Sequence, residues 1–402
     1  MVILSQLVST GLSFGIDMAC RFPGYYLPLR EDYTFYYSKI RAEGLKKVKG
    51  QDYLVAFDPE KVASLKAFDE AHCGGVGSEI PCDRCFGCRL NARKEWTYRL
   101  VNESEMYDPS KVWFLTLTYD SSELTYGYST DIDPRTGELL IFNRPSINYS
   151  DYDAFRMRLS KRYEYDHKHE KGYIPVRQYH CGEYGEKFQR PHFHAIVFGP
   201  QLADLARDSR PFGKNGLRIS DDLSKLWGKG YAVLEPACYE TMEYTAGYVL
   251  KKSIGLDKSE KIERFYAAFD LPPVYEDFRG KSRLAMPDTM ISFEKASGSN
   301  RPGIGRSWYD AHKDEVYRTD EMTIMRKGRA LHVKPPAYYD RLFDADQPWS
   351  IPIIKMKRVA KAEARKTALL EEQHLTEEAY ASLQLELDEL KFKKIRRIAG
   401  NF

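Results

Sequence analysis

Two histidines separated by a single residue, His192 and His194, are the first candidates for chemistry in this chain. They lie in "RPHFHAIVFGP", whose apolar and aromatic residues predict a strand. Alternate side chains of a strand point to the same face, so both imidazoles project together while Phe193 points to the opposite, packed face. Two such imidazoles can bind one divalent cation. The alternative is a pair of ordinary strand histidines.

The preceding segment offers a third ligand. "YIPVRQYHCGEY" predicts a second strand, joined to the first by the turn "GEKFQR". Antiparallel pairing in this hairpin would bring Glu183 close to the imidazoles. Two nitrogens and one carboxylate leave coordination positions open for a phosphate oxygen, which a Mg²⁺ or Mn²⁺ Lewis acid requires. The pattern predicts a Mg²⁺ or Mn²⁺ site.

A second chemical group follows in "YTAGYVLKK". Tyr244 and Tyr248 are four residues apart and share a helix face, and Lys251 follows one turn later. A tyrosine phenoxide can attack a phosphodiester and leave a 5′-phosphotyrosine and a free 3′-OH. A metal ion and an ammonium group would stabilise the developing charge. The alternative is that both tyrosines are core residues of an amphipathic helix.

The elements that must position these groups predict an α+β fold with a mainly antiparallel sheet. Residues 111–120, "KVWFLTLTYD", predict a buried strand, and a loop rich in Gly, Pro, Asn and Asp extends from there to about residue 149. Ser150 is the expected N-cap of a helix in which Phe155 and Leu159 face inward. Further along, "DDLSKLWGKG", "YAVLEPA" and "ETMEYTAGYVLKKS" predict a helix, a strand and a helix.

The overall charge gives no indication of a nucleic-acid partner, because 61 basic and 58 acidic side chains leave a net charge of +3. Local basic groups are therefore the candidates for phosphate contacts. They are Arg89 and Arg93 on a helix over "NARKEWTYRLVNESEMY", Arg158, Lys161 and Arg162 on the helix after residue 150, and Arg301 and Arg306 in "RPGIGRSWY". The alternatives are solvated helix faces and a structural turn.

The chain has 7 cysteines, and this odd number without a convincing export signal favours metal binding over disulfides. Cys82, Cys85 and Cys88, with Cys73 nine residues before them, can supply thiolates to a structural Zn²⁺. The alternative is a set of thiols around a tight turn. Cys181 is expected to be a core thiol. The N-terminus lacks the basic residues of a signal peptide, and no apolar stretch is long enough to span a membrane.

Together, "FLTLTY", "GEYGEKFQRPHFHAIVFG" and "YTAGYVLKK" resemble, in order and spacing, the three motifs of HUH rolling-circle replication initiators. The flanking segments "MACRFPGYYLPL", "PCDRCFGCRLNARKEW", "RPGIGRSWY" and "PPAYYDR" narrow the resemblance to the replication initiation protein of gokushovirus-type microviruses, which are single-stranded DNA phages. The resemblance covers roughly residues 18–345 and implies an HUH-endonuclease-like antiparallel sheet flanked by helices.

The resemblance also implies roles for individual residues. It makes His192, His194 and Glu183 metal ligands, Tyr244 and Tyr248 paired nucleophiles, and Lys251 the lysine of the Y-x-x-K pattern. Glu186 and His180 compete with Glu183 for the place of third ligand. Glu186, however, lies in the predicted turn, and strand alternation turns His180 away from Glu183.

The implied activity is site-specific nicking of one DNA strand at a viral origin, followed by rejoining of the strand. The implied partners are single-stranded and origin DNA, with host polymerase and helicase for synthesis and unwinding, because the chain has no P-loop. The implied location is the cytoplasm of a bacterial host. Two other readings remain open: an HUH transposase or relaxase, and a non-catalytic, zinc-stabilised DNA-binding regulator.

The domain organisation expected from these patterns has five parts. They are an N-terminal extension at 1–17, a region with the cysteine knuckle and a basic helix at 18–109, an HUH endonuclease core at 110–255, an accessory region at 256–350 and a charged helical segment at 351–402. The last segment is expected to serve interactions rather than the core.

Overall fold

The computed structural model describes residues 23–28, 53–56, 58–72, 78–83, 85–171, 173–185, 188–199, 209–212, 217–247, 256–278, 281–290, 292, 295–299, 302–348, 350–380, 382–383, 386–387 and 390. The chain divides into two compact units, an N-terminal unit within residues 7–92 and a main unit within residues 93–402. The predicted extension at 1–17 lies outside the described residues.

The N-terminal unit is built on a small antiparallel sheet. Its strands are β1 (Gly24–Pro28), β2 (Tyr53–Ala56) and β3 (Ser78–Ile80), in the order β2-β1-β3. Helix α3 (Pro59–His72) packs on this sheet. The buried apolar side chains are Tyr25, Leu27, Leu54, Ala56, Leu65 and Phe68. The described core of this unit is therefore small.

The main unit contains a seven-stranded sheet whose pairings are all antiparallel. The order is β14-β7-β8-β4-β11-β10-β9. The strands are β4 (Val112–Tyr119), β7 (Arg177–Tyr184), β8 (Pro191–Phe198), β9 (Arg210–Pro211), β10 (Arg218–Ser220), β11 (Gly230–Pro236) and β14 (Lys295–Gly298). The predicted α+β class and the β7–β8 hairpin are confirmed.

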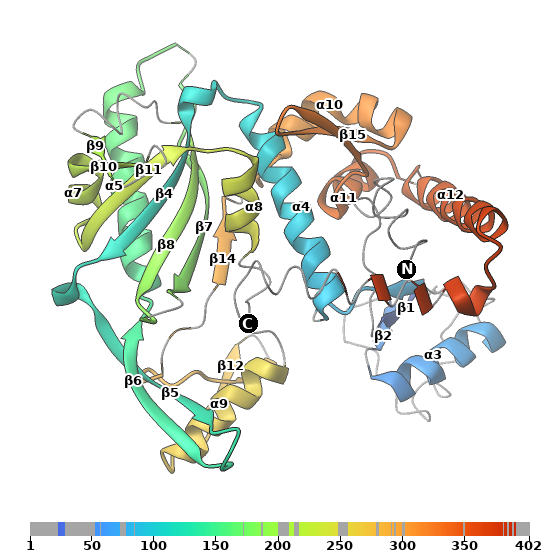
Figure 1. Cartoon of the computed structure of the whole chain (residues 1–402), viewed down its shortest axis with the longest axis horizontal. Helices are drawn as coiled ribbons and strands as arrows, with labels where there is room; N and C mark the ends of the chain where they lie inside the picture. The colour runs from blue at the N-terminus through green and yellow to red at the C-terminus, as the bar shows by residue number, and fades with distance from the viewer. Residues whose placement is uncertain are drawn as a thin grey trace. The chain divides into compact units, whose positions relative to one another are not determined.

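Helices cover both faces of this sheet (Figure 1). Helices α5 (Tyr149–His167) and α7 (Asp221–Trp227) pack on one face, where Phe155 and Leu159 are buried against Phe193, as predicted. Helix α8 (Tyr239–Gly247) and helix α4 (Phe86–Ser104) contribute buried side chains to the core on the opposite face. The histidine-bearing strand β8 lies inside the sheet, between β7 and β4.

The core on the α8 side continues into the C-terminal part of the chain. It includes side chains of α10 (Arg306–Thr319), β15 (Met322–Arg326) and α11 (Ala337–Asp346); β16 (Arg329–Val333) pairs with β15. Helix α12 (Ser350–Glu372) begins in the same core, because Ile351 is 4% exposed.

The start of α12 is therefore not an appended segment, and that part of the prediction is wrong. The guanidinium of Arg358 also fixes the helix, since it donates to Asp320 at 2.8 Å and to Asp340 at 2.6 Å. Apolar side chains at the first turn, which the charged composition of the segment outweighs, anchor the helix.

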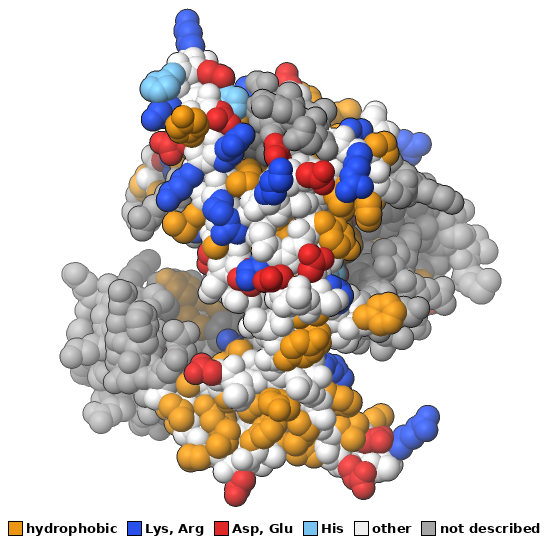
Figure 2. Space-filling model, turned by 90° about the vertical axis from the view of Figure 1, so that its left-hand side faces the viewer, with side chains coloured by type: hydrophobic (Ala, Val, Ile, Leu, Met, Phe, Trp, Pro, Cys, Tyr) orange, Lys and Arg blue, Asp and Glu red, His pale blue; other side chains and the backbone are white. Residues whose placement is uncertain are grey.

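The predicted loop up to residue 149 is also wrong in part, because it contains a hairpin of β5 (Thr125–Ile132) and β6 (Leu139–Ser146). The apolar residues of this hairpin alternate around a turn in which the Gly137 amide donates to the Asp133 carbonyl oxygen. Helix α9 (Leu256–Ala268) and the small hairpin of β12 (Tyr275–Phe278) and β13 (Lys281–Leu284) complete this part. Figure 2 shows apolar side chains on the lower part of its face, where this hairpin lies.

Helix α5 begins before the predicted cap. Asn148 is the N-cap, and its side chain accepts a hydrogen bond from the Ser150 amide at 3.1 Å. Ser150 is thus inside the first turn, because the side-chain carbonyl group of Asn148 is the better-placed acceptor. No helix in the described parts of the chain combines the length and apolar character needed to cross a membrane.

Candidate metal and tyrosine site

Glu183, His192 and His194 come together on two neighbouring strands. Glu183 lies opposite His192 in the β7–β8 register. The Nε2 atom of His192 is 3.0 Å from Glu183 Oε1, and the Nε2 atom of His194 is 3.8 Å from Glu183 Oε2. One potential ligand atom from each residue lies within 4.8 Å of the others. A single cation can bridge atoms at this spacing.

The second nitrogen of each imidazole fixes the direction of the ring. His192 Nδ1 lies 3.2 Å from the backbone carbonyl oxygen of Arg190, which can only accept a hydrogen bond. His194 Nδ1 lies 3.0 Å from the hydroxyl oxygen of Thr116, the residue opposite it on β4. When both Nδ1 atoms donate, both Nε2 atoms present a lone pair on the side of Glu183, as metal-binding histidines do.

The surroundings of the three side chains fit a bound cation. Glu183 is 5% exposed and His194 is 6% exposed. Among the described residues, the Oε2 atom of Glu183 has no hydrogen-bond partner. A buried carboxylate oxygen without a partner is costly unless it binds a cation. The donor set of two imidazoles and one carboxylate suits a divalent metal ion.

The other candidates for the third ligand are placed differently. His180 stacks on Tyr152 of α5 at 3.9 Å between ring centroids, on the opposite face of the sheet, so it faces away from Glu183 as expected. Glu186 lies outside the described residues. Cys181 is fully buried, in agreement with a core thiol.

Gly182 explains how Glu183 reaches its position. A Cβ atom at this residue would lie 2.9 Å from the Tyr149 hydroxyl and 3.0 Å from the ring of Phe193, which is opposite Gly182 in the hairpin. The absence of a side chain lets Phe193 pack there. The resulting register places the next residue, Glu183, beside His192.

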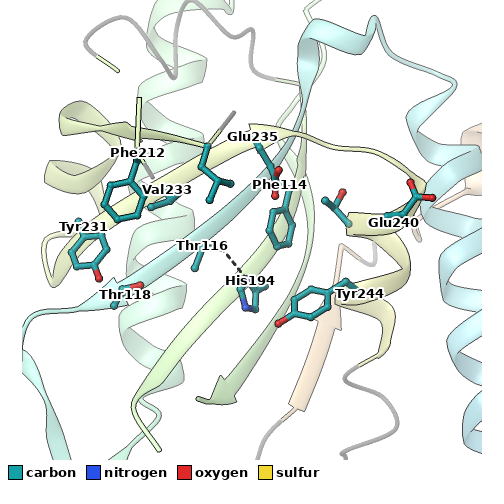
Figure 3. A pocket seen from close by; sticks show the side chains of 12 residues that line it. Phe114, Thr116, Thr118, His194, Phe212, Tyr231, Val233, Glu235, Glu240 and Tyr244 are labelled. Atoms are coloured by element: carbon teal, nitrogen blue, oxygen red, sulfur yellow. Dashed lines mark hydrogen bonds between the residues drawn. The ribbon is translucent and has the colours of Figure 1, made fainter. Parts of the chain in front are cut away.

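Tyr244 projects from α8 toward the histidines (Figure 3). Its ring meets the ring of His194 edge-on at 5.2 Å and that of Phe114 at 6.3 Å, while Phe114 stacks on His194 at 5.3 Å. Met242 and Ala246 of the same helix are buried, but Tyr244 is 46% exposed. The alternative that Tyr244 is a core residue is therefore wrong. Tyr248 and Lys251 lie outside the described residues.

Two arginines hold the residue that precedes Tyr244. Arg93 of α4 donates from Nε to the backbone carbonyl oxygen of Glu243 at 3.3 Å, and its Nη2 lies 3.6 Å from the Glu243 carboxylate. Arg326 at the end of β15 donates to the same carboxylate at 3.3 Å and covers the ring of Tyr239. This clamp fixes α8 from two sides. The sequence predicted Arg93 as a DNA contact and gave no reason to select Arg326 or Glu243.

A groove of about 490 Å³ runs along the sheet beside the site. His194 and Tyr244 lie toward one end, and the exposed rings of Phe212 and Tyr231 lie at the other, 6.2 Å apart (Figure 3). Glu235 also lines the groove, and burial raises the pKa of its carboxyl group. The groove thus combines aromatic surfaces with few charges. Sequence patterns had not singled out Phe212, Tyr231 or Glu235.

The other predicted DNA-binding residues are scattered. Arg158 donates to the carbonyl oxygens of Leu226 and Trp227 at the end of α7, while Lys161 and Arg162 are exposed on α5. Figure 2 shows that basic side chains on the upper part of its face are mixed with acidic ones. Arg89 is half-buried in α4, and Arg301 lies outside the described residues.

The glycines of "RPGIGRSWY" have a packing role. A Cβ atom at Gly303 would lie 2.5 Å from the Tyr338 hydroxyl. Gly305 has a φ of 80° and donates its amide to the buried carboxylate of Glu103 at 2.6 Å. Arg306 pairs with Asp310 at 2.9 Å. This segment is a structural turn at the start of α10.

In the N-terminal unit, Cys82, Cys85 and Cys88 form a second group with potential metal-binding atoms within 4.8 Å of one another. Cys73 lies outside the described residues. The predicted gathering of three of the four cysteines is therefore confirmed.

Comparison with known proteins places the chain among phage replication proteins. A family model for replication-associated proteins of the ORF2 type matches residues 112–253, which include the strands and the helix of the site. The chain is 27% identical over 307 residues to "Replication-associated protein ORF2" of Spiroplasma virus 4, covering 76% of this chain and 80% of that protein.

Two further relatives are similar. "Replication-associated protein VP4" of Bdellovibrio phage phiMH2K is 23% identical over 297 residues, which is 72% of this chain and 77% of the relative. "Replication-associated protein ORF4" of Chlamydia phage 1 is 27% identical over 229 residues, which is 54% of this chain and 48% of the relative. No solved structure matches the chain.

These matches define the class first: the chain is a replication-associated protein of the kind encoded by small phages. More narrowly, it belongs to the family of replication initiators of gokushovirus-type microviruses.

Proposed function

We propose that this protein is an HUH-type endonuclease and strand transferase that nicks one DNA strand at a viral origin and later rejoins it. The observation that carries the proposal is the position of Tyr244, whose ring lies 5.2 Å from that of His194, beside the group of Glu183, His192 and His194. A nucleophile and a metal site are thus adjacent on one face of the sheet.

His192, His194 and Glu183 would hold a Mg²⁺ or Mn²⁺ ion. When bound, such an ion polarises the scissile phosphate and stabilises the charge that develops on its oxygens. The residues of the chain supply the rest of the geometry. Thr116 and the Arg190 carbonyl oxygen direct the two imidazoles, and Glu183 supplies a negative charge that offsets part of the charge of the cation.

Tyr244 would act as a nucleophile in the first transfer. Its phenol loses its proton, the phenolate oxygen attacks phosphorus, and the bond from phosphorus to the 3′ oxygen breaks. The departing oxygen takes up a proton and becomes the free 3′-OH that a polymerase extends. The 5′-phosphotyrosine conserves the energy of the phosphodiester, so rejoining by attack of a 3′-OH needs no other energy source.

Tyr248 and Lys251 enter the proposal from the sequence pattern alone. A second tyrosine would allow a second strand transfer while the first adduct persists, and a lysine one turn later would place an ammonium group near the phosphate. An amine there would stabilise the same developing charge as the metal ion.

The groove is the proposed binding site for the single strand that leads to Tyr244. Phe212 and Tyr231 are exposed rings on which bases can stack, an interaction that tolerates different sequences. The exposed basic residues Lys161 and Arg162 are proposed to contact phosphates outside the groove, with a contribution that salt reduces. Host polymerase and helicase, in the host cytoplasm, would supply synthesis and unwinding.

The test is the formation of a covalent protein–DNA adduct. The full chain is incubated with end-labelled single-stranded origin DNA from its phage, with Mn²⁺, Mg²⁺ or a chelator, and a labelled protein band is measured under denaturing conditions. We expect an adduct with a metal ion and none with the chelator. Tyr244→Phe, Tyr248→Phe and the double variant test the nucleophiles, and Tyr165→Phe on the exposed surface of α5 is the matched control.

Each outcome decides between specific readings. The absence of an adduct with either metal would reject the enzyme and favour a non-catalytic DNA-binding regulator. An adduct that persists in the Tyr244→Phe, Tyr248→Phe double variant would reject the assigned nucleophiles. An adduct lost in Tyr165→Phe would show that the loss reflects folding.

A further inference from the structure

The three cysteines of the N-terminal unit form a geometry that a single metal ion requires. Cys82 and Cys88 are buried and Cys85 is half-buried. The sulfur atoms of Cys82 and Cys88 are 3.9 Å apart, and none of the three residues is in a disulfide. Around a tetrahedral zinc ion with bonds of about 2.3 Å, thiolate sulfurs lie about 3.8 Å from each other. The observed separation matches this value.

Backbone amides point at two of the sulfur atoms. The Cys85 amide donates to the sulfur of Cys82 at 3.3 Å, and the Cys88 amide donates to the sulfur of Cys85 at 3.5 Å. The two C-x2-C turns therefore have the same internal hydrogen bond. An amide that donates to sulfur favours the negatively charged thiolate, which is the form that binds a metal ion. Asp83, with a φ of 55°, provides the left-handed bend of the first turn.

The position of Cys88 adds to this preference. It lies in the first turn of α4, where the N–H groups of the helix end carry partial positive charge. A thiolate is stabilised at such a position. The three sulfur atoms thus receive donors from the chain and converge on one point.

The spacing C-x2-C-x2-C also occurs in clusters of iron and sulfide. In such a cluster, each cysteine binds a different iron atom, so the cysteine sulfurs are held farther apart than around one ion. The 3.9 Å separation of the Cys82 and Cys88 sulfurs therefore favours a mononuclear centre.

We propose that Cys82, Cys85 and Cys88 supply three thiolates to a structural zinc ion, with release of three thiol protons on binding. Zinc prefers four ligands, and the fourth comes from a donor outside this set. The ion links the end of β3 at Ile80 to the start of α4 at Phe86. The described core of the N-terminal unit contains only six buried apolar residues, and a metal centre commonly compensates for a small core. This proposal is independent of the nicking activity.

The experiment uses the full chain, purified under reducing conditions, with zinc, iron and acid-labile sulfide measured. Zinc is then replaced by Co²⁺, because thiolate ligands give an intense near-ultraviolet charge-transfer band that histidine and carboxylate ligands do not. We expect bound zinc without sulfide, and a cobalt–thiolate band in the wild type. The Cys82→Ser, Cys85→Ser double variant loses this band, whereas Cys238→Ser, an exposed cysteine outside the group, keeps it.

A His192→Ala, His194→Ala variant separates the two metal sites, and it keeps the cobalt–thiolate band. If the double cysteine variant does not fold, the wild-type spectrum remains decisive. Iron with sulfide, a disulfide between Cys82 and Cys88 in the native protein, or the absence of a cobalt–thiolate band in the wild type would each overturn the proposal. Retention of the full band in the double cysteine variant would do the same.

Discussion

Replacing Thr116 with valine tests how far the candidate metal site depends on the direction of one imidazole. Valine has nearly the same shape as threonine but cannot pair with His194 Nδ1, which lies 3.0 Å from the Thr116 hydroxyl. His194 is 6% exposed, so water cannot readily replace the lost partner. Leaving one buried donor without a partner costs about 1–3 kcal/mol.

This free energy corresponds to a loss of roughly 10- to 100-fold in metal affinity, which is also the usual effect of removing an outer hydrogen bond from a metal-binding histidine. The assay is a titration of the DNA-free protein with Mn²⁺, followed by the free-ion signal in electron paramagnetic resonance. The dependence of adduct formation on Mn²⁺ should shift by the same factor, with the rate at saturating Mn²⁺ largely restored.

Two variants control for other effects of the substitution. Thr116→Ser keeps the hydroxyl group and should keep the affinity. Thr118→Val makes the same chemical change on the same face of β4, opposite His192, whose Nδ1 is held by a backbone carbonyl oxygen instead. It should leave Mn²⁺ affinity unchanged. Wild-type affinity in Thr116→Val, or an equal loss in Thr118→Val, would refute this account of the site.

Three further predictions concern the clamp, the groove and the C-terminal helix. Arg93→Gln should slow adduct formation about tenfold without changing Mn²⁺ affinity, since it removes interactions of roughly 1–2 kcal/mol that hold Glu243; a change in Mn²⁺ affinity would contradict this role. Because burial raises the pKa of Glu235, its negative charge is lost as pH falls toward that pKa, and single-stranded DNA should then bind more tightly. Glu235→Gln should bind about two- to fivefold more tightly at neutral pH and lose this dependence in fluorescence anisotropy, and weaker binding would indicate that the carboxylate accepts a hydrogen bond from DNA. Ile351→Ala should lower the free energy of unfolding by about 2–4 kcal/mol in urea titrations, whereas Ile353→Ala, at an exposed position on the same helix, should change it by less than about 0.5 kcal/mol.

The part of the site that depends on short-range pattern could be predicted from the sequence. Strand alternation places His192 and His194 on one face, and a hairpin with a short turn brings Glu183 beside them. The β5–β6 hairpin had a similar local signal, namely alternating apolar residues around an Asp-Pro-Arg-Thr-Gly turn. It was missed because its strands contain many polar residues that are also common in loops.

The parts that depend on pairing between distant segments could not be predicted in the same way. Thr116 reaches His194 only because β4 pairs with β8 in one particular register, and a shift of one residue would turn the threonine to the other face. Strand β14 extends the sheet beside β7 from a position more than a hundred residues away in the chain. A single sequence contains no local signal for either pairing.

The position of Tyr244 combines both kinds of information. Helical spacing predicts that Tyr244 and Tyr248 share a face, but it does not say whether that face points at the histidines or into the core. Packing of Met242 and Ala246 against the sheet decides the rotation of α8, and the Arg93 and Arg326 clamp on Glu243 decides its position along the sheet. A tyrosine nucleophile must approach phosphorus in line with the leaving oxygen, so small shifts of the helix would be costly to the reaction. The two arginines are therefore as much a part of the proposed reaction as the side chains that would contact DNA, although neither lies in a motif that names the chemistry.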